Sequence, residues 1–518
     1  MSAGVTARTR RFPASAAILV AAAVLAASAC MSPGGDVTVV RSDTADGATS
    51  TSTEGADTGP DETGPGTTGT PGTDDGPALD PDAEYEFIPG IVDFGDVEPS
   101  HPQYDAFLTT AIADIEQFWA EAYPAVYDAP WEPLEGGVFA ASPRRTDPIP
   151  GCGETESDYD DIADNAFYCT ESDFIAYDDF GLLPSLVDSL GREAVAVVLA
   201  HEFGHAVQWR TDSFRQPTIL LEQQADCFAG AWTAHVADGD SELIAFDDAG
   251  VRGGLLAMLS VADPIDGAGL ADPQAHGSGF DRVGAFQDGF IGGVERCSTF
   301  FTENRFDQLI ELAFDPFDSA GNLPLIDSTG EGSDIVTLLP ASLEEYWTAL
   351  TVANGVPFEP PTFSEFRGAG PYPTCSTVPD GDWAGRVVYC PDDNTIHWDI
   401  DAAFDILIEP FSGDMSVGYL FSTAYGDAIQ TALRTARSGE RRALMNDCLT
   451  GTWTAAIVPV DSEPIFLSAG DLDEAVMTAI RVADERSSDD VLGSAFEKVD
   501  AFRAGVLGGL ASCQSQFP

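Results

Sequence analysis

The chain has 518 residues, 44% of them hydrophobic, and its 86 acidic and 23 basic side chains give a formal net charge of −63. A field of that sign repels phosphate, so nucleic acid is excluded as a partner and extended contact with anionic lipid headgroups is disfavoured. The hydrophobic content is sufficient for buried cores, and the length corresponds to roughly two to four domains.

The N-terminus has the features of a secretory signal. A basic stretch, residues 8–11, precedes an apolar run over residues 14–29 that is short for a bilayer span. Residues 27–29 (Ala-Ser-Ala) fit a signal-peptidase site, which would release a soluble secreted protein. The same region resembles the lipobox of bacterial lipoproteins, with Cys30 as the lipidated residue. We predict a signal peptide over residues 1–29 and an extracytoplasmic protein anchored in the cell membrane by lipid on Cys30, with soluble secretion as the alternative.

Residues 30–83 are predicted to form a disordered linker that starts at the lipidated cysteine. Residues 31–83 are rich in Gly, Thr, Asp, Pro and Ser and contain no aromatic residue. Such a segment buries too little apolar surface to offset the entropy lost on ordering. We expect it to act as a tether between the membrane and the folded part of the chain.

Residues 192–209 are predicted to form a largely buried helix, because they are rich in Ala and Val and contain no Pro. His201 and His205 lie four residues apart, so both imidazoles face the same side of this helix and can bind one metal ion. Glu202 lies on the flank of that face, where a carboxylate reaches a metal-bound water without ligating the metal. A short strand over residues 174–178 precedes the helix; as an edge strand it could pair with an extended peptide substrate.

A second helical segment, residues 220–232, supplies the remaining candidates. Catalytic zinc sites use three protein ligands plus water, so two histidines leave the site incomplete. Glu222 is the predicted third ligand, and Cys227 is a rival for that position. Asp226, one turn after Glu222 on the same face, can accept a hydrogen bond from a zinc-bound imidazole and fix its tautomer.

The order of these blocks resembles known metallopeptidases. HEFGH followed by E-x-x-x-D resembles the gluzincins, and AHEFGHAVQ, LEQQADCFAGAW and HGS with Arg282 downstream are similar to the neutral zinc metallopeptidase family of bacteria. The similarity covers residues 152–297, with Gln223 in place of the family's usual Leu. It implies a zincin-like fold and hydrolysis of peptide bonds, and it leaves the substrate undefined.

The implied mechanism is hydrolysis assisted by one Zn²⁺ ion on His201, His205 and Glu222. The metal lowers the pKa of its bound water towards ~7, and Glu202 takes the proton as general base and returns it to the leaving amine. By similarity with the family's HGS block, His276 is the candidate donor to the developing oxyanion; a structural role for this histidine is the alternative.

The second half of the sequence repeats the first. The paired blocks are residues 115–119 and 343–347, 167–169 and 388–390, 200–208 and 422–430, 226–232 and 447–453, and 277–297 and 493–513. At the positions of His201, Glu202, His205, Glu222 and His276 the copy has Thr423, Ala424, Asp427, Ala443 and Leu492. Such side chains do not supply a stable zinc set, so we expect zinc in the N-terminal domain only and a pseudo-enzyme domain after it.

Without Cys30 the chain has eight cysteines, an even set that allows 105 pairings. We expect the cysteines to bond within each half and in the same way in both halves. Among such pairings, the resemblance to the family implies one. Its pairs are Cys152–Cys169, Cys227–Cys297, Cys375–Cys390 and Cys448–Cys513. The second pair would pin the helix of the third ligand to the segment that follows His276.

We therefore predict an α+β protein with two tandem, homologous, mainly helical zincin-like domains, each with a small β-sheet, over residues 84–304 and 305–518. The predicted function is an extracytoplasmic zinc metallopeptidase acting on a peptide or protein substrate, with membrane contact only through the N-terminal lipid. The alternative is a non-catalytic, zinc-stabilised lipoprotein that acts as a binding or scaffold module. The sequence does not specify the oligomeric state.

Overall fold

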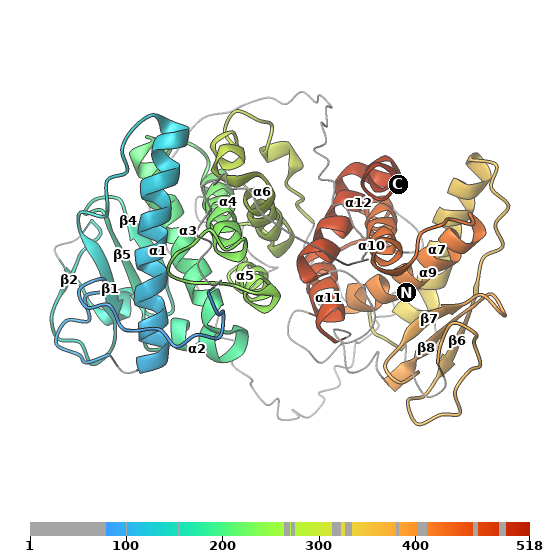
Figure 1. Cartoon of the computed structure of the whole chain (residues 1–518). Helices are drawn as coiled ribbons and strands as arrows, with labels where there is room; N and C mark the ends of the chain where they lie inside the picture. Colours follow the sequence, from blue (N-terminus) through green and yellow to red (C-terminus); the bar gives the residue numbers. More distant parts are fainter. Residues whose placement is uncertain are drawn as a thin grey trace, which may run out of the picture.

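The chain folds into two lobes that follow the sequence (Figure 1). The computed structural model describes residues 79–99, 101–153, 156–263, 270, 275–312, 323–326, 334–379, 383–401, 412–458, 465–485 and 494–518. We call residues 79–312 the first half and residues 323–518 the second half. The predicted signal peptide, the lipidation site Cys30 and most of the predicted linker lie outside the described residues.

The first half combines a long N-terminal helix, short strands and a helical group. Its elements are α1 (Pro102–Tyr127), β1 (Gly137–Ala141), β2 (Ile149–Pro150), β3 (Glu156–Ser157), β4 (Ala166–Cys169), β5 (Phe174–Asp178), α2 (Leu182–Leu190), α3 (Arg192–Arg210), α4 (Thr218–Ala237), α5 (Asp248–Ser260) and α6 (Gly279–Ser298). The predicted α+β class is confirmed, with helices dominating.

The second half has the same kinds of element in the same order. They are α7 (Ile335–Ala353), β6 (Thr362–Phe366), β7 (Val387–Cys390), β8 (Thr395–Asp399), α9 (Asp414–Ala432), α10 (Gly439–Ala456), α11 (Asp471–Glu485) and α12 (Ala495–Gln516). This order corresponds to α1, β1, β4, β5, α3, α4, α5 and α6 of the first half. In Figure 1, α5 and α6 of the first lobe face α11 and α12 of the second.

Each half contains a three-stranded sheet with the same connectivity. The order is β1-β5-β4 in the first half and β6-β8-β7 in the second, with one parallel and one antiparallel neighbour for each central strand. Every residue of β5 is buried. The prediction that residues 174–178 could be an edge strand is wrong, because β5 is hydrogen-bonded on both sides; the edge strand that contacts α3 is β4.

Helix α3 runs through the core of the first half, where β4 and helices α1, α2, α4 and α5 contact it. Its apolar side chains are buried around the helix, which fits a sequence rich in Ala and Val rather than one with a single apolar face. Gly204 allows α4 to approach closely, because a Cβ at this position would lie 2.8 Å from Cα of Ala225. The two helices that carry the predicted ligands are therefore held backbone to backbone.

Glycines also bring α4 against α6. A Cβ at Gly230 would lie 1.9 Å from the carbonyl oxygen of Phe286, and one at Gly289 would lie 1.8 Å from that of Cys227. Either added methyl group would force the helices apart. The same close approach recurs between α10 and α12 at Gly451.

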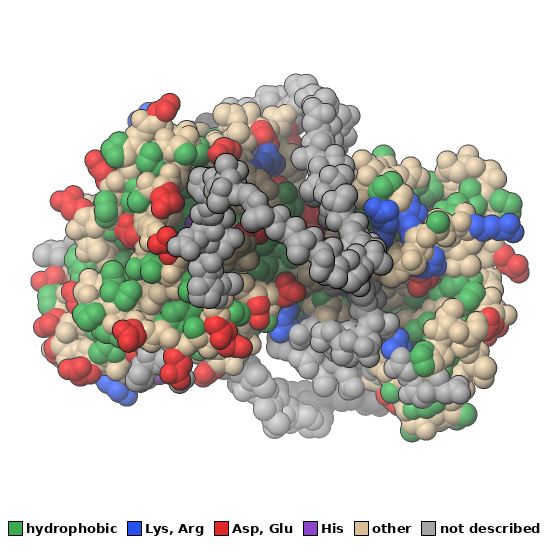
Figure 2. Space-filling view, in the orientation of Figure 1, with side chains coloured by type: hydrophobic (Ala, Val, Ile, Leu, Met, Phe, Trp, Pro, Cys, Tyr) green, Lys and Arg blue, Asp and Glu red, His purple; other side chains and the backbone are tan. Residues whose placement is uncertain are grey.

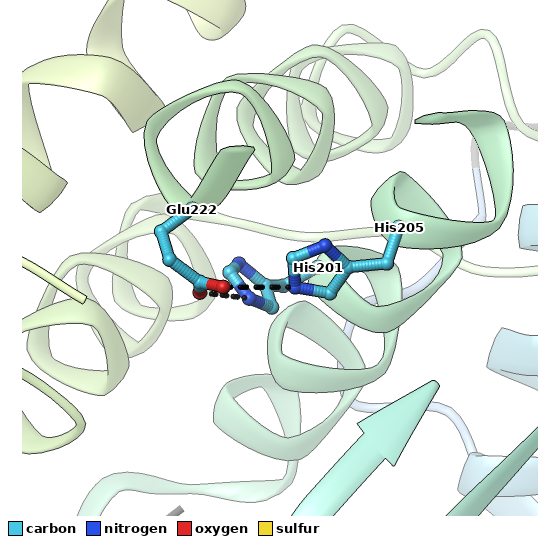
Figure 3. A group of neighbouring side chains, drawn as sticks. All are labelled: His201, His205 and Glu222. Carbon is cyan, nitrogen blue, oxygen red and sulfur yellow. Dashed lines mark ion pairs between the residues drawn. The ribbon is translucent and has the colours of Figure 1, made fainter. Parts of the chain in front are cut away.

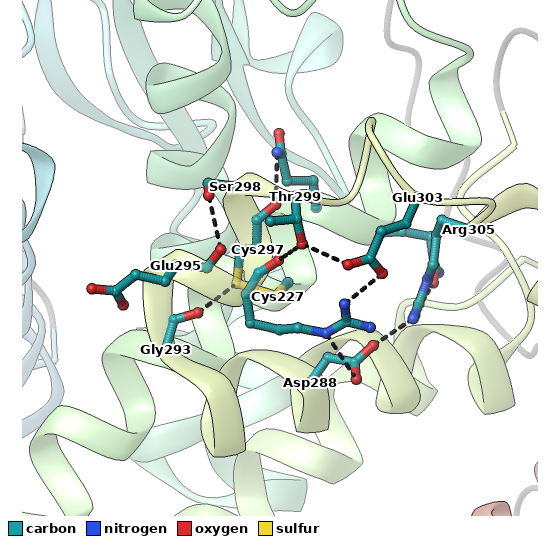
Figure 4. Close-up of a disulfide and its surroundings, with 12 residues drawn as sticks. Cys227, Asp288, Gly293, Glu295, Cys297, Ser298, Thr299, Glu303 and Arg305 are labelled. Carbon is teal, nitrogen blue, oxygen red and sulfur yellow. Dashed lines mark hydrogen bonds and ion pairs between the residues drawn. A yellow bond between two sulfur atoms is a disulfide. The ribbon is translucent and has the colours of Figure 1, made fainter. Parts of the chain in front are cut away.

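Four disulfides confirm the predicted pairing of the cysteines. They are Cys152–Cys169, Cys227–Cys297, Cys375–Cys390 and Cys448–Cys513. The Cys227–Cys297 bridge joins α4 to the last turn of α6 (Figure 4). In its surroundings, Asp288 pairs with Arg296 and with Arg305.

The surface reflects the acidic composition. Figure 2 shows acidic side chains scattered over this face of the first lobe, whereas basic side chains, which are arginines, gather mainly on the second. Across the described residues, every helix is too short or too polar to cross a lipid bilayer.

We predict that removal of the Cys227–Cys297 bridge costs more stability than removal of Cys152–Cys169. The first bridge closes a separation of 70 residues and the second one of 17, so the unfolded chain gains more entropy when the first is absent. Loop-closure entropy gives about 4 kcal/mol for the first and about 3 kcal/mol for the second. Urea unfolding of the two double Cys→Ala variants measures the difference; equal losses would contradict this ranking.

Asp179, directly after β5, is a buried carboxyl group beside other carboxyl groups. Burial, together with the charges of Asp105 and Asp178, raises the pKa of Asp179 to about 8. An unfolded Asp titrates near pH 4, so between about pH 4 and pH 8 the folded state holds the proton more tightly. Through this range the contribution of Asp179 to stability decreases as the pH rises.

We therefore expect Asp179→Asn to be more stable than the unaltered chain at pH 8, by up to a few kcal/mol, and to unfold with a flatter pH dependence between pH 4 and pH 8. Thermal unfolding across this range tests it. Asp96→Asn is the control, because hydrogen bonds from Thr146 lower the pKa of Asp96 to about 2, so the stability due to Asp96 is lost only in more acidic solution. Parallel curves for Asp179→Asn and the unaltered chain would contradict the prediction.

Candidate metal centre

Three side chains from α3 and α4 converge on one point (Figure 3). His201 and His205 lie one turn apart on α3, and Glu222 faces them from α4. Nε2 of His201 is 3.2 Å from Oε2 of Glu222, and Nε2 of His205 is 3.5 Å from Oε1. The potential ligand atoms of the three residues all lie within 4.8 Å of one another. The structure thus brings together the three side chains that the sequence predicted as ligands.

The spacing of these atoms fits a zinc ion. Ligand atoms at about 2.0–2.2 Å from zinc and at tetrahedral angles lie about 3.4 Å from one another. The two separations between histidine nitrogens and carboxylate oxygens, 3.2 and 3.5 Å, match that tetrahedron edge. A set of two imidazoles and one carboxylate is also the type that catalytic zinc sites use, with the fourth position left for water or substrate.

The outer nitrogen of His201 is fixed by a buried carboxylate. Its Nδ1 is 2.7 Å from Oδ1 of Asp226. Arg282, on α6, donates to both oxygens of the same carboxylate, at 2.7 and 3.0 Å. The carboxylate therefore accepts from the imidazole while its charge is balanced by the guanidinium, and Nε2 is left to face the metal position. Asp226 lies where the sequence predicted, and the role of Arg282 in balancing its charge is added by the structure.

The outer nitrogen of His205 is fixed by an amide. Its Nδ1 is 2.9 Å from Oε1 of Gln208, and Nε2 of Gln208 donates to the carbonyl oxygen of Leu221 at 2.6 Å. Gln208 thus links the metal helix to the start of the Glu222 helix. Sequence reasoning missed this role, although a glutamine three residues after the second histidine on an otherwise apolar helix was a usable signal.

The electrostatics of the site favour a bound cation. Burial opposes a charge on His201, but the carboxylates of Asp226 and Glu222 outweigh it and raise the pKa of this imidazole to about 10. Burial likewise opposes the charge on Glu222, but the two histidines hold the pKa of its carboxyl group well below the usual range. Positive charge at this point is therefore stabilised from several sides, whether protons or a metal ion supply it.

Glu202 is buried beside the ligands without belonging to their set. Burial raises the pKa of its carboxyl group; positive charge on His201 and His205, and a hydrogen bond from the backbone of Tyr168 on β4, partly offset that effect. A carboxylate with an elevated pKa next to a metal site is suited to accept a proton from water. Its position agrees with the role that the sequence predicted.

His276 lies in the segment that leads into α6. Its Nδ1 is 3.0 Å from Oδ1 of Asp263, and its backbone N–H donates to Oδ2 of the same residue at 2.8 Å. Within the described part of the chain, no contact joins its side chain to the three candidate ligands or to Glu202. The predicted role at an oxyanion stays a prediction, and the Asp263 contacts show what holds this histidine in place.

The corresponding positions of the second half form no such group. The Thr423 hydroxyl donates to the carbonyl of Leu420, and Asp427 pairs with Arg442 at 2.7 Å. Asp447, the counterpart of Asp226, accepts hydrogen bonds from Lys498 and Tyr419, each at 2.7 Å. The second half thus keeps the buried carboxylate but surrounds it with a lysine and a tyrosine.

Comparison with known proteins agrees with this site. Residues 99–300 match the family model described as putative neutral zinc metallopeptidase. The matched region contains the three candidate ligands and, in addition, Glu202 and Asp226. The match confirms the family predicted for this part of the chain. No solved structure matches the chain.

Bacterial relatives cover the same region. The uncharacterised protein YpfJ of Escherichia coli K12 is 26% identical in an alignment of 228 positions that covers 39% of this chain and 74% of that protein. The uncharacterised protein Rv2575 of Mycobacterium tuberculosis H37Rv is 29% identical in an alignment of 201 positions that covers 33% of this chain and 67% of that protein.

We predict that Asp226→Asn weakens zinc binding by about 10- to 100-fold, because the amide no longer holds His201 through a charged acceptor. Competition with a chromophoric chelator measures the dissociation constant. The matched control is Asp447→Asn, which alters the equivalent buried carboxylate of the second half and should leave zinc affinity within about twofold. Equal effects of the two variants would show that the loss reflects general destabilisation.

Proposed function

We propose that the first half of the chain is a zinc-dependent peptidase in which Glu202 is the general base. The observation that carries this proposal is the convergence of His201, His205 and Glu222 with a buried carboxylate beside them. A site that bound zinc only for stability would have no use for Glu202 next to the ligand set. The family matched by residues 99–300 supports a hydrolase of this class.

The chain's own groups have distinct tasks in such a reaction. His201, His205 and Glu222 would hold the zinc ion, which supplies Lewis acidity for activating water and polarising the scissile carbonyl. Asp226 and Gln208 orient the two imidazoles. Glu202 accepts a proton from the attacking water on its carboxylate and donates it to the nitrogen of the leaving amine, which balances the protons of hydrolysis.

The edge strand β4 supports a peptide as the substrate. Extended peptides bind to exposed sheet edges through backbone hydrogen bonds. β4 pairs with β5 on one side only, and the backbone of Tyr168 on its other side contacts Glu202. We propose that a substrate strand adds to β4 and so passes beside the three candidate ligands, in place of the pairing with β5 that the sequence suggested.

The four disulfides favour an oxidising compartment. They support the proposal that the enzyme acts outside the cytoplasm, tethered by lipid on Cys30 or, as the alternative, secreted. The proposed partner is a peptide or protein substrate, and the acidic surface argues against nucleic acid.

The decisive experiment is Glu202→Gln. We expect kcat for a cleaved peptide from a library to fall by about 10²- to 10⁴-fold while zinc affinity stays unchanged, because the side chain acts on the proton and not on the metal. Glu193→Gln is the control on the same helix; Glu193 pairs with Arg192 away from the ligands, and its loss should leave kcat unchanged.

Full turnover by Glu202→Gln would contradict the proposed mechanism. If the zinc-loaded chain hydrolyses no peptide of a diverse library and Glu202→Gln binds the same partner as well as the unaltered chain, the alternative of a zinc-stabilised binding module is correct instead.

A further inference from the structure

We infer that the second half of the chain supports the metal centre of the first, with Asp473 as the positioning residue that closes the N-terminus of α6. This inference rests on the proposed function, since it concerns the same zinc site. It assigns a task to the half in which other residues stand at the positions of His201, His205 and Glu222: holding the helix that carries Arg282.

The first contact lies at the start of α6. The backbone N–H of Gly279 donates to Oδ2 of Asp473 at 2.9 Å, and that of Phe280 donates to Oδ1 at 2.7 Å. The first N–H groups of a helix have no partner within the helix, and a carboxylate there also interacts favourably with the helix dipole. Asp473 belongs to the first turn of α11, so the second half satisfies this end of α6.

The second step runs along α6 to the metal centre. Arg282 lies within the first turn after the contact with Asp473, and its guanidinium holds both oxygens of Asp226. Asp226 in turn lies 2.7 Å from Nδ1 of His201. A displacement of the first turn of α6 would therefore move Arg282. Because Arg282 holds Asp226, and Asp226 holds His201, the position of this candidate zinc ligand would change as well.

Further contacts fix α6 to α12. The guanidinium of Arg503 donates to the carbonyl oxygen of Phe280 and lies 4.4 Å from the centre of its ring. Gly284 leaves the space that this side chain occupies, because an added Cβ would lie 1.8 Å from the guanidinium. Nearly two turns after Gly284, the rings of Phe290 and Phe496 lie 4.5 Å apart. The second half thus contacts α6 along several turns, in addition to the packing of α6 on α4.

The two equivalent helices, α6 and α12, are capped differently. Helix α12, the counterpart of α6, closes its own N-terminus with a capping box formed by Ser494 and Glu497. At the start of α6, Ser278 caps one N–H group, that of Asp281, and Asp473 takes those of Gly279 and Phe280. The first half therefore depends on the second for these two N–H groups, which lie at the start of α6.

The test uses the full chain and measures zinc affinity, which does not require a known substrate. We expect Asp473→Ala to weaken zinc binding by about 10-fold, the lower end of the range for residues that orient ligands. Asp473→Asn keeps one acceptor oxygen and should restore part of the affinity. Glu497→Gln is the matched control, because it removes a carboxylate from the N-terminus of α12, and it should leave zinc affinity unchanged.

A second measurement separates positioning from loss of folding. Hydrogen exchange of the backbone amides at the start of α6 should rise in Asp473→Ala, and the visible spectrum of the Co²⁺-substituted protein should change, while circular dichroism and both disulfides of the second half stay as in the unaltered chain. A zinc affinity in Asp473→Ala equal to that of the unaltered chain, or an equal loss in Glu497→Gln, would overturn the inference. An unaltered chain that binds no zinc would overturn both the proposed function and this inference.

Discussion

The burial of opposite charges between α3 and α4 is the constraint on which the first half depends. Glu222 and Asp226 are carboxylates with almost no exposure, and such groups are costly to bury unless cationic partners balance them. Two imidazoles and one guanidinium supply that balance, and a divalent ion at the shared point would complete it. The glycines that bring α4 close to α3 and α6 make these short contacts possible. The core of this half is thus built around the charges rather than around an apolar centre alone.

The two halves have the same order of elements but differ in the side chains around their buried aspartates. Both have a mixed three-stranded sheet, a helix pair packed through glycine and equivalent disulfides. In the first half the buried aspartate faces a histidine and an arginine, and in the second it faces a tyrosine and a lysine. The exchange keeps a cationic partner beside the carboxylate, so the scaffold persists although other side chains stand at the positions of the three candidate ligands. This agreement supports a common origin of the halves, as the repeated sequence blocks suggest.

Much of the site could be predicted from the sequence, because its chemistry is local. His201 and His205 are one turn apart, and Glu222 with Asp226 repeats that spacing on the next helix. The disulfide pairing followed from the two similar halves and from the resemblance to the family. The place of β5 at the centre of its sheet could not be found this way, since strand neighbours depend on contacts between distant segments. The same holds for Asp473, whose partners lie 194 and 193 residues away in the chain.

Lys498, which pairs with Asp447 in the second half, is the only lysine of the chain and has an exposed fraction of 3%. The folded protein therefore offers amine-directed reagents no side-chain target on its surface, and proteases that cut after lysine have a single, inaccessible position. Acylation at this residue would require the α10–α12 pair to separate. The chain thus contains a built-in chemical reporter for opening of its second half, independent of the metal and of any substrate.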